Sequence, residues 1–276
     1  MLHSSIVANT TRMIQGIDTG ALAPLSPRSI VLSVLLGSHP PQMPVGHILE
    51  FTSLFDLADG TVRTALSRMV TAGELVNDDG TYRLVGRLVE RQVQQDVGRN
   101  HPPAAWDRDW WTVAVLPERR TMLGRRAFRA WAIGARLGEL RPDLWLRPAN
   151  IDIPLDPPDA LVTRGPLITG DERHLVSQLW DLHDLEHRSA GHLCGLDDAA
   201  FRLDDPDNHS LADAFVALAG AQQFLRIEPQ LPAQLTSDAS IRAVRDLYGQ
   251  VVDKFQARLT DFFAERSADR ISTTAQ

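Results

Sequence analysis

The sequence predicts an α+β protein built from more than one domain, and three observations indicate this class. With 276 residues, the chain is long enough for two or three domains of ordinary size, each with its own core. A hydrophobic content of 43% and a charged content of 23% are typical of globular proteins. Segments with helical spacing of apolar residues alternate with short apolar runs bounded by turn residues, which favours helices and strands in one chain.

Three features favour a cytoplasmic protein. The sequence has no run of about 18 apolar residues, so we expect no membrane-spanning helix. The segment MLHSSIVANTTRMIQG lacks the basic start, apolar core and cleavage site of a secretory signal. The single cysteine, Cys194, cannot form an internal disulfide and has no obvious neighbouring base in the sequence. We interpret Cys194 as a structural or incidental thiol rather than a nucleophile.

Charge is unevenly distributed along the chain, whose formal net charge is −7. Residues 26–100 carry 7 basic and 8 acidic side chains, residues 101–150 carry 9 and 5, and residues 151–276 carry 11 and 21. Charges are screened over about 8 Å at physiological ionic strength. Acidity in the last part of the chain therefore weakens attraction of DNA to the first part without preventing it.

Residues 1–25 show no sustained periodicity and are expected to be a flexible N-terminal extension. From Ser26 the pattern predicts a helix in SPRSIVLSVLLG, because a capping serine, Pro27 in the first turn and a final glycine frame an apolar face. A second short helix is predicted in VGHILEFTSLF, where apolar residues again recur at helical spacing.

A third helix is predicted from about Asp59 to Ala72, with Gly73 ending it. Its apolar side consists of Val62, Ala65, Leu66, Met69 and Val70. Its opposite side consists of Thr64, Ser67, Arg68 and Thr71, with Arg63 at the border. The segment GELVNDDGTYRLV then predicts a hairpin, because Asp79 and Gly80 form a strong two-residue turn signal.

Three helices followed by a hairpin are the order of a winged helix-turn-helix. In this arrangement the third helix enters the major groove of DNA, and the hairpin contacts the flanking backbone or the minor groove. An amphipathic helix with arginines on its polar side is also common as a plain solvent-exposed helix. The ordered combination of elements favours DNA binding.

The middle of the sequence predicts an α+β sandwich. GRLVERQVQQDVGRN is expected to be a helical linker, and WWTVAVLP and DLWLRP are expected to be strands on either side of a helix in RRTMLGRRAFRAWAIGARLG. IDIPLDPPDALVTRGPLITG is expected to supply a loop and one further strand. The predicted helix carries a basic run that either contacts phosphates, lies in solvent, or contacts the acidic C-terminal part: Arg119, Arg120, Arg125, Arg126 and Arg129.

From about Asp171 the pattern is mostly helical. Three long amphipathic stretches are DERHLVSQLWDLHDLEHR, SLADAFVALAGAQQFLR and SIRAVRDLYGQVVDKFQARLTDFFAER. Their many apolar positions predict a helical bundle, part of which is a candidate dimer interface.

Several segments together resemble the PaaX-like family of bacterial transcriptional regulators, named for repressors of phenylacetate degradation. The most specific segment is TVRTALSRMVTAGEL, and the next are WDRDWWTVAVLPE and RRAFRAWAIGARLGELRPDLWLRP. A weaker likeness lies in LWDLHDL and in FLRIEPQLPAQL with the later AVRDLYGQV. In order, these segments span about residues 27–263.

The resemblance implies a winged helix over residues 26–100, a ferredoxin-like sandwich similar to Cas2 proteins over residues 101–170, and a helical domain for dimerisation and effector binding over residues 171–276. It implies a homodimer that represses a catabolic operon and leaves its double-stranded operator when an aryl- or acyl-CoA thioester binds. No cofactor and no enzymatic activity are expected. An alternative is a regulator or scaffold that keeps the fold without a small-molecule effector.

The same resemblance places the DNA-reading helix at Thr61 to Ala72. The expected DNA-binding residues are Thr61, Arg63, Thr64, Ser67 and Arg68 in this helix and Tyr82 and Arg83 in the hairpin. Arg126 and Arg129 are candidates for contacts with CoA phosphates. The chain departs from the family pattern at Asp56, at Gly60 and in the segment GARLGEL.

Two enzyme hypotheses have a specific origin in the sequence. His183 to His187, HDLEH, match the H-x-x-E-H pattern of inverted zinc peptidases, so these two histidines are weak metal-ligand candidates. Zinc catalysis also needs a third ligand and a cleft, and a surface helix explains the same residues. Cas2-like proteins can be metal-dependent nucleases, but WWTVAVLPE has no aspartate to hold Mg²⁺, which argues against this hydrolase chemistry.

Overall fold

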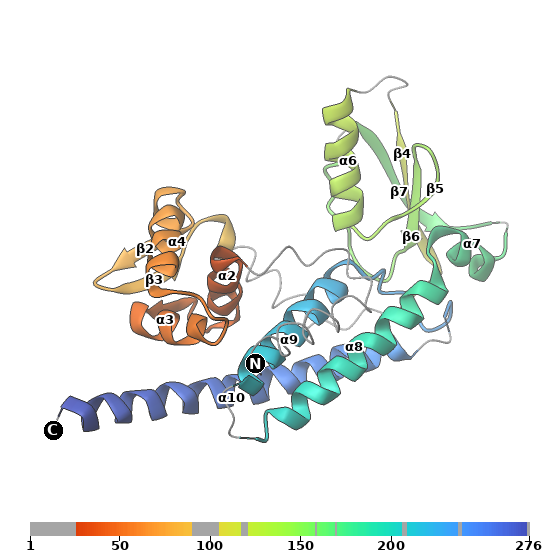
Figure 1. Cartoon of the computed structure of the whole chain (residues 1–276). Helices are drawn as coiled ribbons and strands as arrows, with labels where there is room; N and C mark the ends of the chain where they lie inside the picture. Colours follow the sequence, from red (N-terminus) through yellow and green to blue (C-terminus); the bar gives the residue numbers. More distant parts are fainter. Residues whose placement is uncertain are drawn as a thin grey trace. The chain divides into compact units, whose positions relative to one another are not determined.

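The computed structural model describes residues 26–89, 105–116, 121–157, 159–168, 170–205, 209–236 and 239–274. It is a mixed α+β structure with two small antiparallel sheets and several helices (Figure 1). This confirms the predicted α+β class. The chain divides into two compact units: residues 1–101, 191–221 and 245–276 form the first, and residues 102–190 and 222–244 form the second.

The N-terminal part of the first unit consists of three helices and a three-stranded sheet. In chain order these elements are α2 (Pro27–Gly37), β1 (Gln42–Pro44), α3 (Val45–Ser53), α4 (Asp59–Thr71), β2 (Leu75–Asp78) and β3 (Thr81–Leu84). The strand order is β1-β3-β2, and both pairings are antiparallel. We call residues 26–89 the helix–hairpin module; it contains α2, α3, α4 and the β2–β3 hairpin seen in Figure 1.

Local sequence explains where the first helix of the module begins and which side it buries. The Ser26 side chain accepts a hydrogen bond from the backbone N–H of Ser29 at 3.1 Å, and Pro27 occupies the first helical position. One side of α2 is then buried among α3, α4 and the sheet. The buried hydrophobic residues of the module are Ile30, Val31, Leu32, Val34, Leu35, Leu36, Met43, Ile48, Leu49, Phe51, Val62, Leu66, Met69, Leu75 and Leu84.

Three long helices follow in the C-terminal half of the chain: α8 (Leu182–Arg202), α9 (His209–Ile227) and α10 (Ser240–Thr274). Each contributes residues to both units. In the first unit their buried side chains recur every three or four residues, as expected for helices that pack along one stripe. They include Leu196, Ala199, Leu211, Ala214, Phe215, Leu218, Ala221, Tyr248, Val251, Phe255, Leu259 and Phe262.

The second unit is built on a four-stranded antiparallel sheet. Its elements are β4 (Asp109–Val115), α6 (Met122–Gly134), β5 (Gly138–Arg141), β6 (Leu144–Pro148), β7 (Ala160–Pro166) and α7 (Glu172–Leu179). The strand order is β5-β6-β4-β7. In Figure 1, α6 lies along the sheet.

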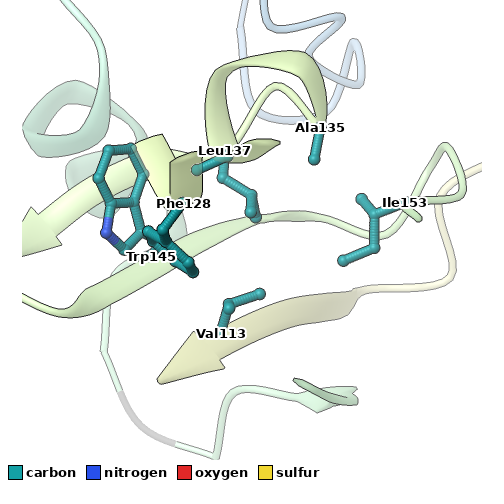
Figure 2. Packing of buried hydrophobic residues seen from close by; sticks show 7 residues of the cluster. Val113, Phe128, Ala135, Leu137, Trp145 and Ile153 are labelled. Carbon is teal, nitrogen blue, oxygen red and sulfur yellow. The ribbon is translucent and has the colours of Figure 1, made fainter. Parts of the chain in front are cut away.

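Successive side chains of a strand point to opposite faces of the sheet, and apolar side chains cover both faces of this one. Val113 pairs with Trp145, and both belong to a buried cluster with Phe128 and Ala132 of α6. Figure 2 shows Val113, Phe128 and Trp145 in this cluster. On the opposite face, Trp110 and Leu146 pack with α7 and with the segment after α9, through Val176, Leu179 and Leu235. Gly138 permits close packing here, because a Cβ atom on it would lie 2.7 Å from the Cβ of Leu179.

A buried arginine joins the sheet to the segment after α9. Arg147 is fully buried, and it donates to the carbonyl oxygens of Ala135, Pro148 and Pro229 at 3.0–3.2 Å and to Oδ1 of Asn150 at 3.2 Å. Burial, and then repulsion from Arg136, lower the pKa of Arg147 to about 9. The side chain is therefore charged at neutral pH, and its carbonyl acceptors compensate for lost water.

The segment after α9 makes further polar contacts with the loops next to the four-stranded sheet. Arg136 donates to the backbone carbonyl of Glu228 at 2.6 Å and to its carboxylate at 3.2 Å. Asn150 donates from Nδ2 to the carbonyl of Gln230 at 2.6 Å. Residues 228–230 are thus held by side chains that lie two residues after the ends of α6 and β6.

The structure differs from the sequence-based expectations mainly in short elements. Strands β1 and β5 were not predicted, and α4 ends one residue earlier than expected. The single strand expected after the proline-rich loop is β7. Residues 1–25, and most of the predicted helical linker, lie outside the described residues. Among the helices that the structure describes, none is long and apolar enough to cross a lipid bilayer.

Replacing Arg147 with lysine is expected to destabilise the second unit by about 3 kcal/mol or more. A lysine ammonium cannot reach four acceptors that surround a planar guanidinium, so a buried charge and buried carbonyls lose partners. Urea unfolding followed by tryptophan fluorescence measures this, because all six tryptophans lie between residues 106 and 180.

The matched control is Arg108→Lys, whose exposed side chain pairs with Glu172 at 2.7 Å. An exposed ion pair contributes no more than about 1 kcal/mol, so this variant should unfold close to the unaltered protein. Equal stability of the Arg147 and Arg108 variants would contradict the role assigned to the buried contacts.

Candidate nucleic-acid interface

Helix α4 separates its side chains into a buried side and an exposed side. Val62, Leu66 and Met69 are at most 1% exposed and form part of the module's core. Their i, i+4, i+7 spacing fixes the rotation of the helix about its axis. The five α4 residues predicted to bind DNA are all exposed on the other side: Thr61, Arg63, Thr64, Ser67 and Arg68.

The two arginines of this exposed side are available for a ligand. Neither Arg63 nor Arg68 has an ion-pair partner among the residues that the structure describes. The Thr64 hydroxyl donates to the carbonyl of Gly60 at 2.8 Å, and the Thr71 hydroxyl donates to that of Ser67 at 3.0 Å. A threonine bound in this way keeps its oxygen lone pairs as acceptors. The surface therefore offers two long cationic donors beside short polar groups.

The C-terminal end of α4 is fixed by its turn and by an ion pair. Gly73 has a φ of 69°, a left-handed conformation that glycine adopts without strain, and its N–H donates to Val70. Glu74 follows, and its carboxylate accepts two hydrogen bonds from Arg28 of α2. This hydrogen-bonded pairing raises the pKa of Arg28. The end of α4 is thus tied to the start of α2.

The β2–β3 hairpin has the turn that the sequence predicted. Asp79 and Gly80 have φ values of 48° and 84°, the two positive values that a type I′ turn requires, and Oδ1 of Asn77 accepts from the N–H of Gly80 at 3.0 Å. Along β3, Tyr82 is half-buried and Arg83 is exposed. Since adjacent strand residues face opposite sides, only Arg83 is fully presented to solvent.

Sequence reasoning missed the third strand of this sheet. Gln42, Met43 and Pro44 form β1 and pair with Arg83, Tyr82 and Thr81. The segment is three residues long and lies next to prolines, so it carries no alternating pattern by which a strand is recognised. Its single signal is buried Met43, which lies between two exposed neighbours.

The two candidate effector residues lie on exposed parts of α6. Arg126 is exposed, and Arg129 donates to Glu139 at 3.1 Å while its guanidinium lies 5.8 Å from the Trp145 ring centroid. These contacts hold Arg129 against the sandwich surface. Met122 and Leu123, in the first turn of α6, are 63% and 78% exposed, so apolar and basic side chains share this end of the helix.

The histidines of the HDLEH segment lie on α8. His183 and His187 are both exposed and one helical turn apart. Within the described parts of the chain, no group of three or more histidine, cysteine or acidic side chains is arranged to hold a metal ion. Cys194 is exposed on the same helix.

Comparison with known proteins assigns the module to a family. Residues 26–90, which contain α4 and the hairpin, match the family model described as PaaX-like protein. This family indicates a transcription regulator that binds DNA. The match places residues 26–90 of the chain in the PaaX-like family.

A solved structure extends the comparison along the chain. The chain is similar to the uncharacterized protein Rv0674 from Mycobacterium tuberculosis, with 30% sequence identity and a TM-score of 0.70. The similarity covers 86% of this chain and 99% of the other. No curated protein matches the chain.

Zinc in the purified protein is expected to be far below one equivalent after dialysis, because His183 and His187 supply only two ligands and a stable site needs at least three from the protein. Elemental analysis measures this directly. One equivalent of zinc that is lost in a His183→Ala, His187→Ala double variant would contradict the expectation.

Proposed function

We propose that the protein is a homodimeric repressor whose two copies of α4 read half-sites of a palindromic operator in double-stranded DNA. The observation that carries this proposal is a pair of exposed arginines that have no ion-pair partner among the described residues, on a helix whose other side is buried in a core. Arg63 and Arg68 supply guanine or phosphate contacts, and Thr61, Thr64 and Ser67 supply shorter hydrogen bonds.

The order of elements supports a winged helix for the module. In this interpretation α3 and α4 are the helix-turn-helix pair, and the β2–β3 hairpin is the wing. Arg83 at the wing contacts the DNA backbone, and Tyr82 supports it from the half-buried side of the same strand. The type I′ turn at Asp79 and Gly80 matches the twist of the two strands and so sets the register that places Arg83.

Local charge is compatible with specific rather than strong nonspecific binding. Residues 26–89 carry five arginines and six acidic residues, so the module has little net attraction for DNA. Nonspecific affinity for DNA comes mainly from neutralising its phosphates with basic side chains. Since the module has few unbalanced basic side chains, its nonspecific affinity is modest and depends only weakly on salt. Specific affinity then depends on side-chain contacts from α4 and on the use of two half-sites.

The second unit is proposed as a ferredoxin-like sandwich that takes part in effector control. Its strand order is β5-β6-β4-β7, and α6 connects β4 to β5 along the chain, which supports this comparison. We propose that an aryl- or acyl-CoA thioester is the effector, with Arg126 and Arg129 as candidate phosphate contacts. The helical region around α8 to α10 is proposed to supply the dimer contact, and a repressor of this kind acts in the cytoplasm.

An Arg63→Ala, Arg68→Ala double variant is expected to lose operator binding by about 1–3 kcal/mol for each arginine that pairs with a guanine, and less for one that meets only phosphate. The operator is first recovered as genomic fragments bound by the unaltered protein. Affinity is then measured by fluorescence anisotropy on that fragment at fixed salt.

The matched control for this pair is Arg242→Ala, because Arg242 is an exposed arginine on α10 outside the module. It should bind the operator as the unaltered protein does. A folded double variant with unchanged affinity would exclude α4 as the reading helix.

Addition of a matching acyl-CoA thioester is expected to raise the thermal stability of the protein. A ligand at 100 times its dissociation constant stabilises the folded state by about 2.7 kcal/mol. A panel of thioesters is screened by thermal shift, and an Arg126→Ala, Arg129→Ala variant should reduce the shift. If the protein binds its operator but no thioester raises its unfolding temperature, the protein is a regulator without this class of effector.

A further inference from the structure

The helix–hairpin module contacts α9 and α10 within the first unit, and three of these contacts join described side chains at separate places. Phe51 and Phe55 of the module form a cluster with Phe215 of α9 and Phe255 of α10, with ring centroids 5.2–6.4 Å apart. Phe51 is fully buried there. We call these four side chains the phenylalanine cluster. It joins the C-terminal end of α3 to two helices that the sequence places about 160 to 200 residues later.

A second contact lies at the end of α2. Nε2 of Gln256 donates to the backbone carbonyl of Gly37 at 3.1 Å. Gly37 is the last residue of α2. Backbone carbonyls in the last turn of a helix receive no hydrogen bond from an N–H group of the same helix. Gln256 therefore caps α2 from α10, next to Phe255 of the phenylalanine cluster.

A third contact lies farther along α10. The imidazole of His47 stacks on the Phe263 ring, with centroids 4.2 Å apart and the ring planes 7° from parallel. Phe263 follows Phe255 by eight residues, which corresponds to about 12 Å along a helix. His47 and Phe263 are both only half-buried, so this stack contributes less to the core than the phenylalanine cluster does.

The arrangement of the three contacts determines what each can do. On α10, the phenylalanine cluster and the Gln256 cap lie at neighbouring positions, and Phe215 of α9 belongs to the same cluster, so these contacts act at one level along the two helices. The His47–Phe263 stack acts about 12 Å farther along α10, where a contact opposes a change in the module's tilt most effectively. Since α4 is locked into the module by Val62, Leu66 and Met69, its direction follows that of the module.

We propose that His47 and Phe263 are positioning residues that set the direction of α4 relative to α9 and α10. The DNA consequence rests on the proposed function. Two copies of α4 match two half-sites at one spacing only if each is held in a fixed direction. Loss of the stack leaves contacts to one half-site intact and relaxes the preference for spacing.

A distance measurement without DNA tests the positioning directly. Cys194 is exposed on the part of α8 in the first unit, and a second label site is made by Thr71→Cys on the exposed side of α4. Labelled chains are diluted into an excess of unlabelled Cys194→Ala protein, so that distances within one chain dominate in a dimer. Pulsed electron–electron double resonance on the two labels should then give one narrow distance distribution. Phe263→Ala and His47→Ala should broaden or split it, whereas His47→Phe, which keeps a ring for stacking, should leave it narrow.

The matched control is Phe201→Ala, because Phe201 lies on α8 in the same unit with 78% of its surface exposed. This variant should keep the narrow distribution. His47→Ala serves as the second variant if Phe263→Ala does not fold, which circular dichroism shows. A distribution that is broad in the unaltered protein, unchanged in both alanine variants, or broadened by His47→Phe overturns the proposal.

Operator fragments with one half-site, or with two half-sites at altered spacing, test the DNA consequence. The alanine variants should bind a single half-site with the affinity of the unaltered protein. Their affinity ratio between the natural and an altered spacing should fall by about threefold to tenfold, which corresponds to the free energy of one aromatic pair. Equal loss on single and paired sites overturns the positioning role. Failure of the unaltered protein to bind any half-site refutes the proposed function instead, and leaves the distance measurement to decide the inference.

Discussion

The burial of Val62, Leu66 and Met69 is the constraint on which the candidate DNA surface depends. These three side chains lie on one line along α4, and rotating the helix enough to move its arginines would bring that line into water. Exposing one such side chain costs about 1.5–3 kcal/mol, so the rotation is strongly opposed. The direction of Arg63 and Arg68 is therefore decided by residues that never meet the ligand.

Arginines in this protein differ in role because their surroundings differ. Arg147 is enclosed by carbonyl oxygens and cannot serve a ligand, whereas Arg28 is paired with Glu74 and fastens two helices. Arg63 and Arg68 have neither burial nor an acidic partner among the described residues. Burial and the nearby acceptors thus distinguish an arginine that holds the core, one that joins two helices and two that are available to a ligand. The residue type alone does not distinguish them.

Regular periodic segments were predictable from the sequence, and contacts between distant segments were not. The apolar stripe of α4 and the turn at Asp79 and Gly80 carry strong local signals, so the helix, the hairpin and the exposed arginines followed from them. Strand β5 is a bulged four-residue strand, which gives it little pattern. Nothing near Arg147 in the sequence indicates burial, because its acceptors include Pro229, which lies 82 residues away.

The first unit is assembled from three separate stretches of chain, and this has a consequence for biosynthesis. At a translation rate of 5–20 residues per second, roughly 10–40 seconds separate the synthesis of Phe51 from that of Phe255. During that interval the apolar side of α3 has no partner from α10. An unfinished chain thus presents an exposed aromatic surface to chaperones and proteases, which distinguishes it from the completed protein.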